Sequence, residues 1–378
     1  MPDESPVAER AELQAPFPWF GGKRRVAHLV WSRFGRDVAN YVEPFFGSGA
    51  VLLARPEVDL DDLPLETAND ADGFVCNLWR AMAREPDAVA EHADRLVHEC
   101  DLQAAHVWLR AQRAALHERL EADLSHCDAK IAGLWVWGQC LWIGSGWCGP
   151  SGAGPWRVED GRLVKGDAGQ GVKRARPQLG NAGKGVQRQL PHLGDAGKGV
   201  QRKRPVLAGP AGGMRLGDNL GPWFAALSAR LRRVRFCCGD WARVTGPSVT
   251  FKHGPTGVFL DPPYDMGERD AGCYAVDTAG LSERVRVWCT ENGANPLLRI
   301  ALCGYAGEGH EALETLGWRV QAWKAHGGYA SQGDERGREN AHRERIWFSP
   351  ACLSEAALAE TGLLHGLDAA KGDESQCT

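Results

Sequence analysis

The chain has 378 residues, of which 43% are hydrophobic and 24% are charged, an ordinary composition for a soluble protein of roughly two or three domains. No apolar run reaches the length of about 18 residues that a membrane span requires, and the twelve cysteines form no C-x-x-C pair, so we expect neither a membrane protein nor a bound metal. The net charge is −4, but the charges are unevenly distributed along the chain. Residues 157–204 contain twelve Lys and Arg but only four Asp and Glu, so this segment is strongly basic.

In chain order, the first predicted elements are a short strand, a loop with Gly47 and Gly49, and the start of a helix, all in YVEPFFGSGAVLLA, residues 41–54. Glycines let a backbone turn sharply and approach a ligand, although this stretch is neither G-x-G-x-x-G nor a P-loop. LETAND, residues 65–70, is predicted as the next strand and ends in Asp70. An acid at a second strand tip is suited to hydrogen bonds with a ribose diol, and Asp70 could also cap the helix that follows.

Residues 76–122 have apolar side chains at three- and four-residue steps, which predicts helices. Further along, 14-residue units rich in Gly and basic residues begin at Gly166, Gly180 and Gly194, so residues 166–207 are an internal repeat. Each unit has too few apolar residues to build a core, and its glycines and proline exclude a long helix. We interpret the repeat as an insert of turns whose Arg and Lys side chains hold a polyanion, with a flexible spacer as the alternative.

The C-terminal half alternates between strands and helices. The predicted elements are a helix and a strand in residues 221–241, strands at 257–261 and 299–305, helices at 282–292 and near 309–317, and strands in 318–323 and 343–350. Such alternation predicts an α/β fold with a doubly wound, mostly parallel sheet and helices on both faces.

The quartet DPPY, residues 261–264, directly follows one of these predicted strands. Its prolines remove two backbone donors and stiffen the turn, so that Asp261 and Tyr264 stand on a rigid edge. By itself such a quartet could also be no more than a rigid turn.

Four motifs in this order resemble those of the Dam-like DNA adenine-N6 methyltransferases, in the alpha arrangement of that family. They are PWFGGKR at 18–24, EPFFGSG at 43–49, ND at 69–70 and DPPY at 261–264. The resemblance covers roughly residues 16–84 and 235–350. It implies a Rossmann-like class I methyltransferase domain formed by residues 16–84 and 231–352. It also implies an inserted helical or irregular target recognition domain in residues 85–230. We expect residues 1–15 to be disordered and residues 353–378 to form a tail.

The resemblance implies S-adenosylmethionine as the cofactor. Trp19 and Lys23 match family positions that contact it, and Asp70 matches the ribose-binding acid. Glu43, Gly47 and Gly49 match the loop at the methionine end, and Asp261 matches a residue that meets both the cofactor and the base.

The chemistry of an adenine amino group explains why the quartet would be needed. The N6 lone pair is delocalised into the ring, so the nitrogen is a poor nucleophile. Asp261 and the carbonyl of Pro262 can each accept one N6 hydrogen and orient the lone pair, while Tyr264 offers a face for stacking. The predicted reaction is direct methyl transfer to an adenine flipped out of duplex DNA.

Other readings stay open for parts of the chain. A cytosine-C5 enzyme is excluded because there is no Pro-Cys pair, whereas a cytosine-N4 or RNA amino-methyltransferase and a non-catalytic DNA-binding relative remain alternatives. WIGSGWCG, residues 142–149, could form a DNA-facing loop or a packed aromatic core. Arg343 and Arg345 could simply pair with acids. We expect a monomeric cytoplasmic protein of bacterial or phage origin that binds double-stranded DNA, with a cognate restriction nuclease as a candidate partner.

Deleting residues 166–207 tests the polyanion interpretation of the repeat. Because basic side chains displace counterions from DNA phosphates, the deletion should weaken DNA binding and flatten its dependence on salt, with methyl transfer retained. The measurement is a titration of duplex DNA at several salt concentrations. An unchanged affinity and salt slope would show that the repeat is a spacer.

Overall fold

The computed structural model describes residues 13–17, 19, 23–56, 64–123, 125–142, 147–149, 156–159, 162–165, 220–263, 280–323 and 342–354. The repeat, Tyr264 and residues 355–378 of the predicted tail lie outside these residues, as do residues 1–12 of the segment expected to be disordered. Residues 13–15 of that segment differ from the expectation, since Leu13 and Ala15 pack against the core and Trp223 donates a hydrogen bond to the carbonyl of Gln14.

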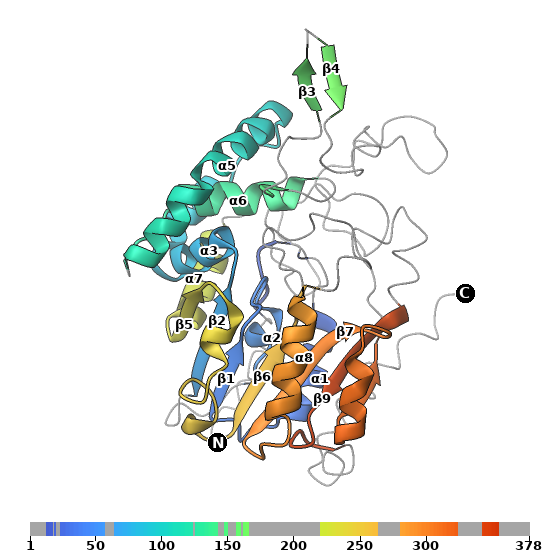
Figure 1. Cartoon of the computed structure of the whole chain (residues 1–378). Helices are drawn as coiled ribbons and strands as arrows, with labels where there is room; N and C mark the ends of the chain where they lie inside the picture. Colours follow the sequence, from blue (N-terminus) through green and yellow to red (C-terminus); the bar gives the residue numbers. More distant parts are fainter. Residues whose placement is uncertain are drawn as a thin grey trace, which may run out of the picture.

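The bounds of the elements follow from the backbone (Figure 1). The helices are α1 (Arg24–Phe34), α2 (Ala50–Leu53), α3 (Gly73–Arg84), α4 (Pro86–Ala93), α5 (Glu99–Ala122), α6 (Ala129–Leu141), α7 (Gly221–Leu231) and α8 (Leu281–Asn292). The 3₁₀ helices are η2 (Trp241–Val244), η3 (Phe251–His253) and η4 (His310–Leu316). The strands are β1 (Asn40–Glu43), β2 (Leu65–Asp70), β3 (Trp156–Glu159), β4 (Arg162–Lys165), β5 (Val234–Cys238), β6 (Thr256–Leu260), β7 (Leu298–Tyr305), β8 (Arg319–Ala322) and β9 (Glu344–Phe348).

The predicted doubly wound, mostly parallel sheet is confirmed. Its strand order is β5-β2-β1-β6-β7-β9-β8. The strands from β5 to β7 are parallel, whereas β9 is antiparallel to both β7 and β8. The chain therefore builds outward from β1 through β2 to β5, and then returns to the other side of β1 with β6. A reversal of this kind opens a crevice at the carboxyl ends of the two strands on either side of it.

Both faces of the sheet are covered, as the alternation of strands and helices predicted. Along a strand, successive side chains point to opposite faces. Tyr41 and Phe259 therefore face the core formed with α1 to α7, whereas Val42 and Val258 face the core formed with η2, α8 and η4. The two cores hold β1 and β6 rigidly between them, which fixes the place where these strands end.

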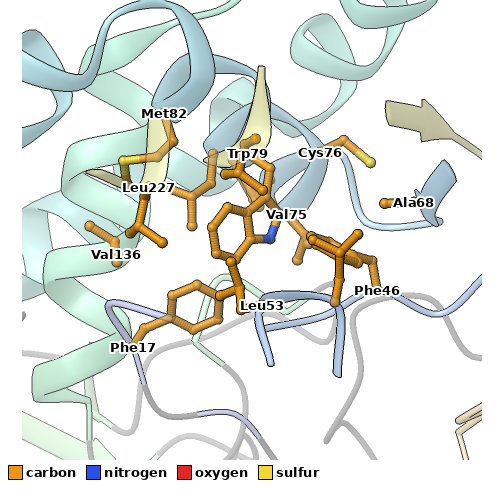
Figure 2. Close-up of a cluster of buried hydrophobic side chains, with 14 of the residues drawn as sticks. Phe17, Phe46, Leu53, Ala68, Val75, Cys76, Trp79, Met82, Val136 and Leu227 are labelled. Carbon is orange, nitrogen blue, oxygen red and sulfur yellow. The ribbon is translucent and has the colours of Figure 1, made fainter. Parts of the chain in front are cut away.

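Trp79 of α3 lies in the larger core with no exposed surface. Figure 2 shows its indole among apolar side chains that include Phe46, Leu53 and Val75. The indole nitrogen needs a partner in such surroundings, and it donates to the carbonyl of Gly47 at 2.9 Å. The core thus holds the glycine loop after β1 in place.

Two elements differ from the sequence predictions. The segment near 309–317 forms a 3₁₀ helix, and Gly309 and Gly317, which both have positive φ, limit it to the seven residues between them. The antiparallel pair β3–β4 was not predicted. The dipeptide Asp160-Gly161 between two short β-forming runs was the available signal, since such a pair favours a two-residue hairpin turn.

The tryptophans at the two ends of residues 142–147 are packed in the core. Trp142 and Trp147 are both buried, and Trp142 stacks on His106 with the ring centroids 4.7 Å apart. The indole of Trp147 donates to the carbonyl of Trp135 at 3.0 Å. For these two side chains the structure favours the packed aromatic core, while residues 143–146 lie outside the described residues.

Glu66 of β2 forms a buried ion-pair network. Its carboxylate accepts hydrogen bonds from Arg55 at 3.1 Å and from both terminal nitrogens of Arg230 at 2.6 and 2.8 Å. Only 6% of the Glu66 side chain is exposed, so its loss would leave two guanidinium groups short of a buried counter-charge.

Replacing Glu66 with glutamine should lower the free energy of unfolding by about 3–5 kcal/mol, because breaking a buried pair leaves uncompensated charge. Urea unfolding of the variant measures this cost. The matched control is Asp37→Asn, because Asp37 also pairs with an arginine, Arg299, but is 61% exposed. The control should cost less than about 1 kcal/mol. Equal costs in the two variants would mean that the Glu66 network is no stronger than a surface pair.

Candidate functional site

A cleft lies at the carboxyl ends of β1, β2 and β6, where the sheet reverses its winding. The cleft is open to solvent, and its empty space is about 920 Å³ when the solvent at its mouth is included. Its lining combines carboxylates with aromatic rings and the glycine loop. The lining includes Trp19, Lys23, Glu43, Phe45, Gly47, Asn69, Asp70, Asp72, Asp240, Trp241, Phe259, Asp261 and Pro263. Six of the predicted cofactor residues therefore meet in one cleft, although they come from sequence positions as far apart as 19 and 261.

The glycine loop is shaped by backbone conformations that suit glycine. Gly47 has φ +47° and Gly49 has φ +62°, in the region that L-residues rarely adopt. A Cβ on Gly47 would come within 2.3 Å of the indole nitrogen of Trp19, and a Cβ on Gly49 would meet the ring of Phe46 at 2.4 Å. Gly47 thus lets Trp19 lie against the loop. Gly49 acts from behind the cleft, as the residue before α2, and does not line it.

Asp70 is held by two backbone N–H groups. One carboxylate oxygen accepts from Gly47 at 2.8 Å and the other accepts from Asp72 at 2.9 Å. Burial raises the pKa of Asp70 to about 6, while these two hydrogen bonds act in the opposite direction. The alternative role considered for Asp70, capping the next helix, belongs to Asp72 instead, which accepts from the N–H of Phe74 at the start of α3. Asp70 thus faces the cleft without a capping role.

Asn69 of β2 ties two loops to the end of its strand at the rim of the sheet. Its side-chain amide donates to the carbonyls of Pro44 and Gly239, each at 3.0 Å. These carbonyls belong to the loops that follow β1 and β5, and Asn69 itself lies on β2. The ND motif therefore has two separate tasks, since Asn69 holds the loops and Asp70 faces the cleft.

Asp261, directly after β6, is paired with Lys23, directly before α1. The Lys23 ammonium lies 2.9 Å from one carboxylate oxygen of Asp261 and 5.5 Å from the ring centroid of Trp323. Only 4% of the lysine is exposed, compared with 18% of the aspartate. The lysine is thus buried behind the carboxylate and fixes its orientation at the edge of the cleft.

Glu43 at the end of β1 is buried beside the cleft. The hydroxyl of Tyr41 donates to its carboxylate at 2.8 Å. Burial raises the pKa of Glu43 well above its usual range, and the negative charge of Asp261 raises it further, while the Tyr41 hydrogen bond opposes both effects. The carboxyl group of Glu43 is therefore costly to ionise, and a positive charge bound nearby would lower that cost.

The remaining predicted residues fall outside the cleft lining or outside the described residues. Pro262 is buried and Pro263 lines the cleft, while Tyr264 lies beyond the part of the chain that the structure describes. The interpretation that Arg343 and Arg345 pair with acids stays a prediction, and the hydrogen bonds that the structure describes for them are to backbone carbonyls. Arg343 donates to the carbonyl of Ala306, and Arg345 donates to those of His342 and Glu344.

Sequence reasoning missed the wall of the cleft that follows β5. Asp240 and Trp241 line the cleft, and the Trp241 ring is inclined by 28° to that of Phe45 with centroids 6.0 Å apart. Arg284 of α8 pairs with Asp240 at 3.3 Å and lies over the Trp241 ring. The available signal was GDW, residues 239–241, an acid and a ring directly after a predicted strand.

Neither a membrane-spanning helix nor a metal-binding cluster is present among the described residues. No helix among them combines the length and apolar character needed to cross a membrane. In the same part of the chain, no three His, Cys, Asp or Glu side chains come together as a metal site would require.

Residues 19–119 match the family model described as D12 class N6 adenine-specific DNA methyltransferase. The match covers about a quarter of the chain, from Trp19 through the glycine loop and Asp70 into α5, and ends before Asp261. It confirms the resemblance to DNA adenine-N6 methyltransferases, and with it the prediction of an enzyme. The seven-stranded, mostly parallel sheet is consistent with a methyltransferase fold. The family implies DNA as the substrate and S-adenosylmethionine as the cofactor. No curated protein matches the chain.

Replacing Gly47 with alanine should weaken binding of S-adenosylhomocysteine at least about ten-fold, because the new methyl group displaces Trp19 from the cleft wall. The matched control is Gly254→Ala. Gly254 also has positive φ, but its Cβ would meet only Ala39 at 3.8 Å, at the opposite end of β6. Both variants should lose stability through backbone strain. Calorimetry should show weaker binding in the Gly47 variant alone, and equal affinities would count against a ligand at this loop.

The pKa of Asp70 predicts a pH dependence of ligand binding. Ligand hydroxyls would donate to the ionised carboxylate, so affinity for S-adenosylhomocysteine should rise as the pH increases from about 5 to about 7. In Asp70→Asn this pH dependence of the affinity should disappear.

The contribution of Asp70 to the free energy of unfolding changes with pH in the opposite direction. Because the folded-state pKa lies above the ordinary 3.8, the folded protein binds more protons between about pH 4 and 6, and Asp70 contributes less to the free energy of unfolding as the pH rises. A wild-type affinity that is flat across pH 5–7 would contradict the assignment of Asp70 to a ligand.

Proposed function

We propose that this protein transfers a methyl group from S-adenosylmethionine to N6 of an adenine flipped out of duplex DNA. The observation that carries the proposal is the Asp261 carboxylate, fixed by Lys23 at 2.9 Å, in the same cleft as Gly47 and Asp70. The cleft thus combines an acceptor for an amino group with a loop and an acid suited to a nucleoside. The family match supplies the class of substrate.

The cleft fits the chemical groups of S-adenosylmethionine. Its carboxylates suit the ammonium, the sulfonium and the ribose hydroxyls, and a cationic ligand would favour the ionised forms of Glu43 and Asp70, whose pKa values are raised by burial. The rings of Phe45 and Trp241 both line the cleft and offer flat surfaces that suit an adenine ring. Gly47 has no Cβ, so the ligand can approach its backbone. When bound, the cofactor supplies an electrophilic methyl group on a positively charged sulfur.

The residues after β6 would activate the amino group. Asp261 would accept one N6 hydrogen, and the carbonyl of Pro262 the other, which concentrates the lone pair on N6 and aims it into the cleft. Once N6 carries the methyl group it must lose a proton, and the Asp261 carboxylate is placed to accept it. Lys23 balances the charge of the carboxylate and prevents it from turning away. Tyr264, the last residue of the quartet, would stack on the extruded base.

The region from residue 85 to residue 230 is proposed to recognise the DNA target. Its described helices, α4, α5, α6 and all but the last residue of α7, pack on α3 within the larger core, so this part is continuous with the sheet domain. The repeat at 166–207 would add contacts to DNA phosphates, which position the enzyme without reading sequence.

Methyl transfer tests the proposal directly. The protein is incubated with S-adenosylmethionine carrying a labelled methyl group and with unmethylated duplex DNA, and the nucleosides are then analysed. We expect N6-methyladenine. Asp261→Ala and Asp261→Asn should reduce the rate by roughly 10²–10³-fold, because a positioned acceptor of this kind acts on the transition state. Asp37→Asn, which alters an exposed carboxylate near the end of α1, should leave the rate unchanged.

The other outcomes separate the alternatives. N4-methylcytosine as the product would replace adenine with cytosine as the target base. Tight binding of S-adenosylmethionine without transfer to DNA would direct the search to RNA. No binding of the cofactor at all would indicate a non-catalytic relative.

A further inference from the structure

Arg113 lies in the middle of α5, outside residues 16–84 and 231–352, which the sequence assigned to the methyltransferase domain. Its guanidinium nevertheless contacts Asp72, which lines the cleft. One terminal nitrogen donates to a carboxylate oxygen of Asp72 at 3.0 Å, and the other donates to the carbonyl of Cys148 at 2.6 Å. The same guanidinium lies 4.6 Å from the ring centroid of Phe74. A planar fork held at both prongs and on one face has a single well-defined position.

Asp72 links Arg113 to Asp70 in the cleft by hydrogen bonds. Its side chain caps α3 by accepting from the N–H of Phe74, and its own N–H donates to the Asp70 carboxylate at 2.9 Å. The other oxygen of Asp70 is bound by the N–H of Gly47 at 2.8 Å. Arg113 therefore stands at the start of a continuous series of hydrogen bonds that ends at the glycine loop.

The second terminal nitrogen of Arg113 holds residues 147–149, which contain a residue with a strained backbone. Among the described residues, Cys148 is the non-glycine residue with positive φ, 53°. Its N–H donates to the ring of His106, and its neighbour Trp147 fills the space beside Gly138 of α6. A Cβ on Gly138 would lie 1.9 Å from the Trp147 ring. Residues 147–149 are thus fixed from three sides and present one carbonyl to Arg113.

We propose that Arg113 is a positioning residue for the cofactor cleft, which makes cofactor affinity depend on how residues 147–149 are packed. The inference rests on the proposed function, since it takes the ligand of the cleft to be S-adenosylmethionine. It places part of the cofactor machinery on α5, in the region assigned to target recognition. Any ligand that shifts residues 147–149 would alter cofactor affinity through this guanidinium, and the reverse follows by linkage.

The primary test is calorimetric binding of S-adenosylhomocysteine to the full-length chain. Arg113→Met should weaken binding about ten-fold. Arg113→Lys should fall between this variant and the wild type, because an ammonium cannot reproduce the two-pronged contact. At saturating S-adenosylmethionine, Arg113→Met should retain its kcat, with the loss confined to KM for the cofactor.

The matched control is Arg80→Met. Arg80 of α3 also joins this helix to the α5 region, by donating to the carbonyls of Leu120, Asp123 and His126, but it does not line the cleft. The control should lose stability and keep its affinity for S-adenosylhomocysteine. Equal losses of affinity in the arginine variants would reduce Arg113 to a structural residue and overturn the proposal.

A second route alters the segment and leaves Arg113 in place. Gly138→Ala should displace Trp147 and weaken S-adenosylhomocysteine binding, whereas Gly133→Ala on the same helix crowds His92 instead and should not. The double variant Gly138→Ala/Arg113→Met should bind no more weakly than Arg113→Met alone, because both changes break one pathway. Additive losses of affinity in the double variant would overturn the proposed coupling.

If the wild type and the controls do not bind S-adenosylhomocysteine, the proposed function fails. If they bind and Arg113→Met binds equally well, only the present inference fails.

Discussion

The hydrogen bond from the N–H of Gly47 to the Asp70 carboxylate is the contact on which the cleft depends. It joins the loop after β1 to the tip of β2, and both residues line the cleft. The bond requires the left-handed backbone of Gly47, and the indole of Trp79 fixes that residue from below by binding its carbonyl. The interior of the protein therefore determines the shape of its reactive edge, because a core tryptophan and a cleft glycine share one hydrogen-bonded unit.

Concentrating carboxylates in one cleft creates an electrostatic problem. Glu43, Asp70, Asp72, Asp240 and Asp261 all line it. The protein reduces their mutual repulsion with three cations, since Lys23 pairs with Asp261, Arg113 with Asp72 and Arg284 with Asp240. For Glu43 and Asp70, the raised pKa values show that ionisation is held back by burial. Positive charge on a bound ligand would make these two groups less costly to ionise, whereas negative charge would make them more costly to ionise.

The helices after residue 85 are part of the same folded body as the sheet. Val89, Leu109 and Val136, on α4, α5 and α6, belong to the core that also contains Tyr41 of β1. The family match likewise continues into α5 and ends at residue 119. The boundary at residue 84 therefore separates the part proposed to bind the cofactor from the part proposed to recognise DNA. It does not separate two hydrophobic cores. This continuity is what allows a side chain such as Arg113 to reach the cleft from the region proposed to recognise DNA.

The sequence by itself determined the alternation of strands and helices, the glycine loop, and six of the cleft residues, but not the wall at Asp240 and Trp241. What it determined depends on local periodicity, on glycine conformation and on motifs of adjacent residues. It also indicated the family, through motifs whose order is visible without a structure. It could not distinguish Asp70 from Asp72 as the helix cap, since both precede α3 and only backbone geometry decides which carboxylate reaches Phe74. Nor could it reveal the pairing of Lys23 with Asp261 or of Arg113 with Asp72. These partners are separated by 238 and 41 positions, and they meet only because the sheet reverses at β1 and β6 and α5 folds back across α3.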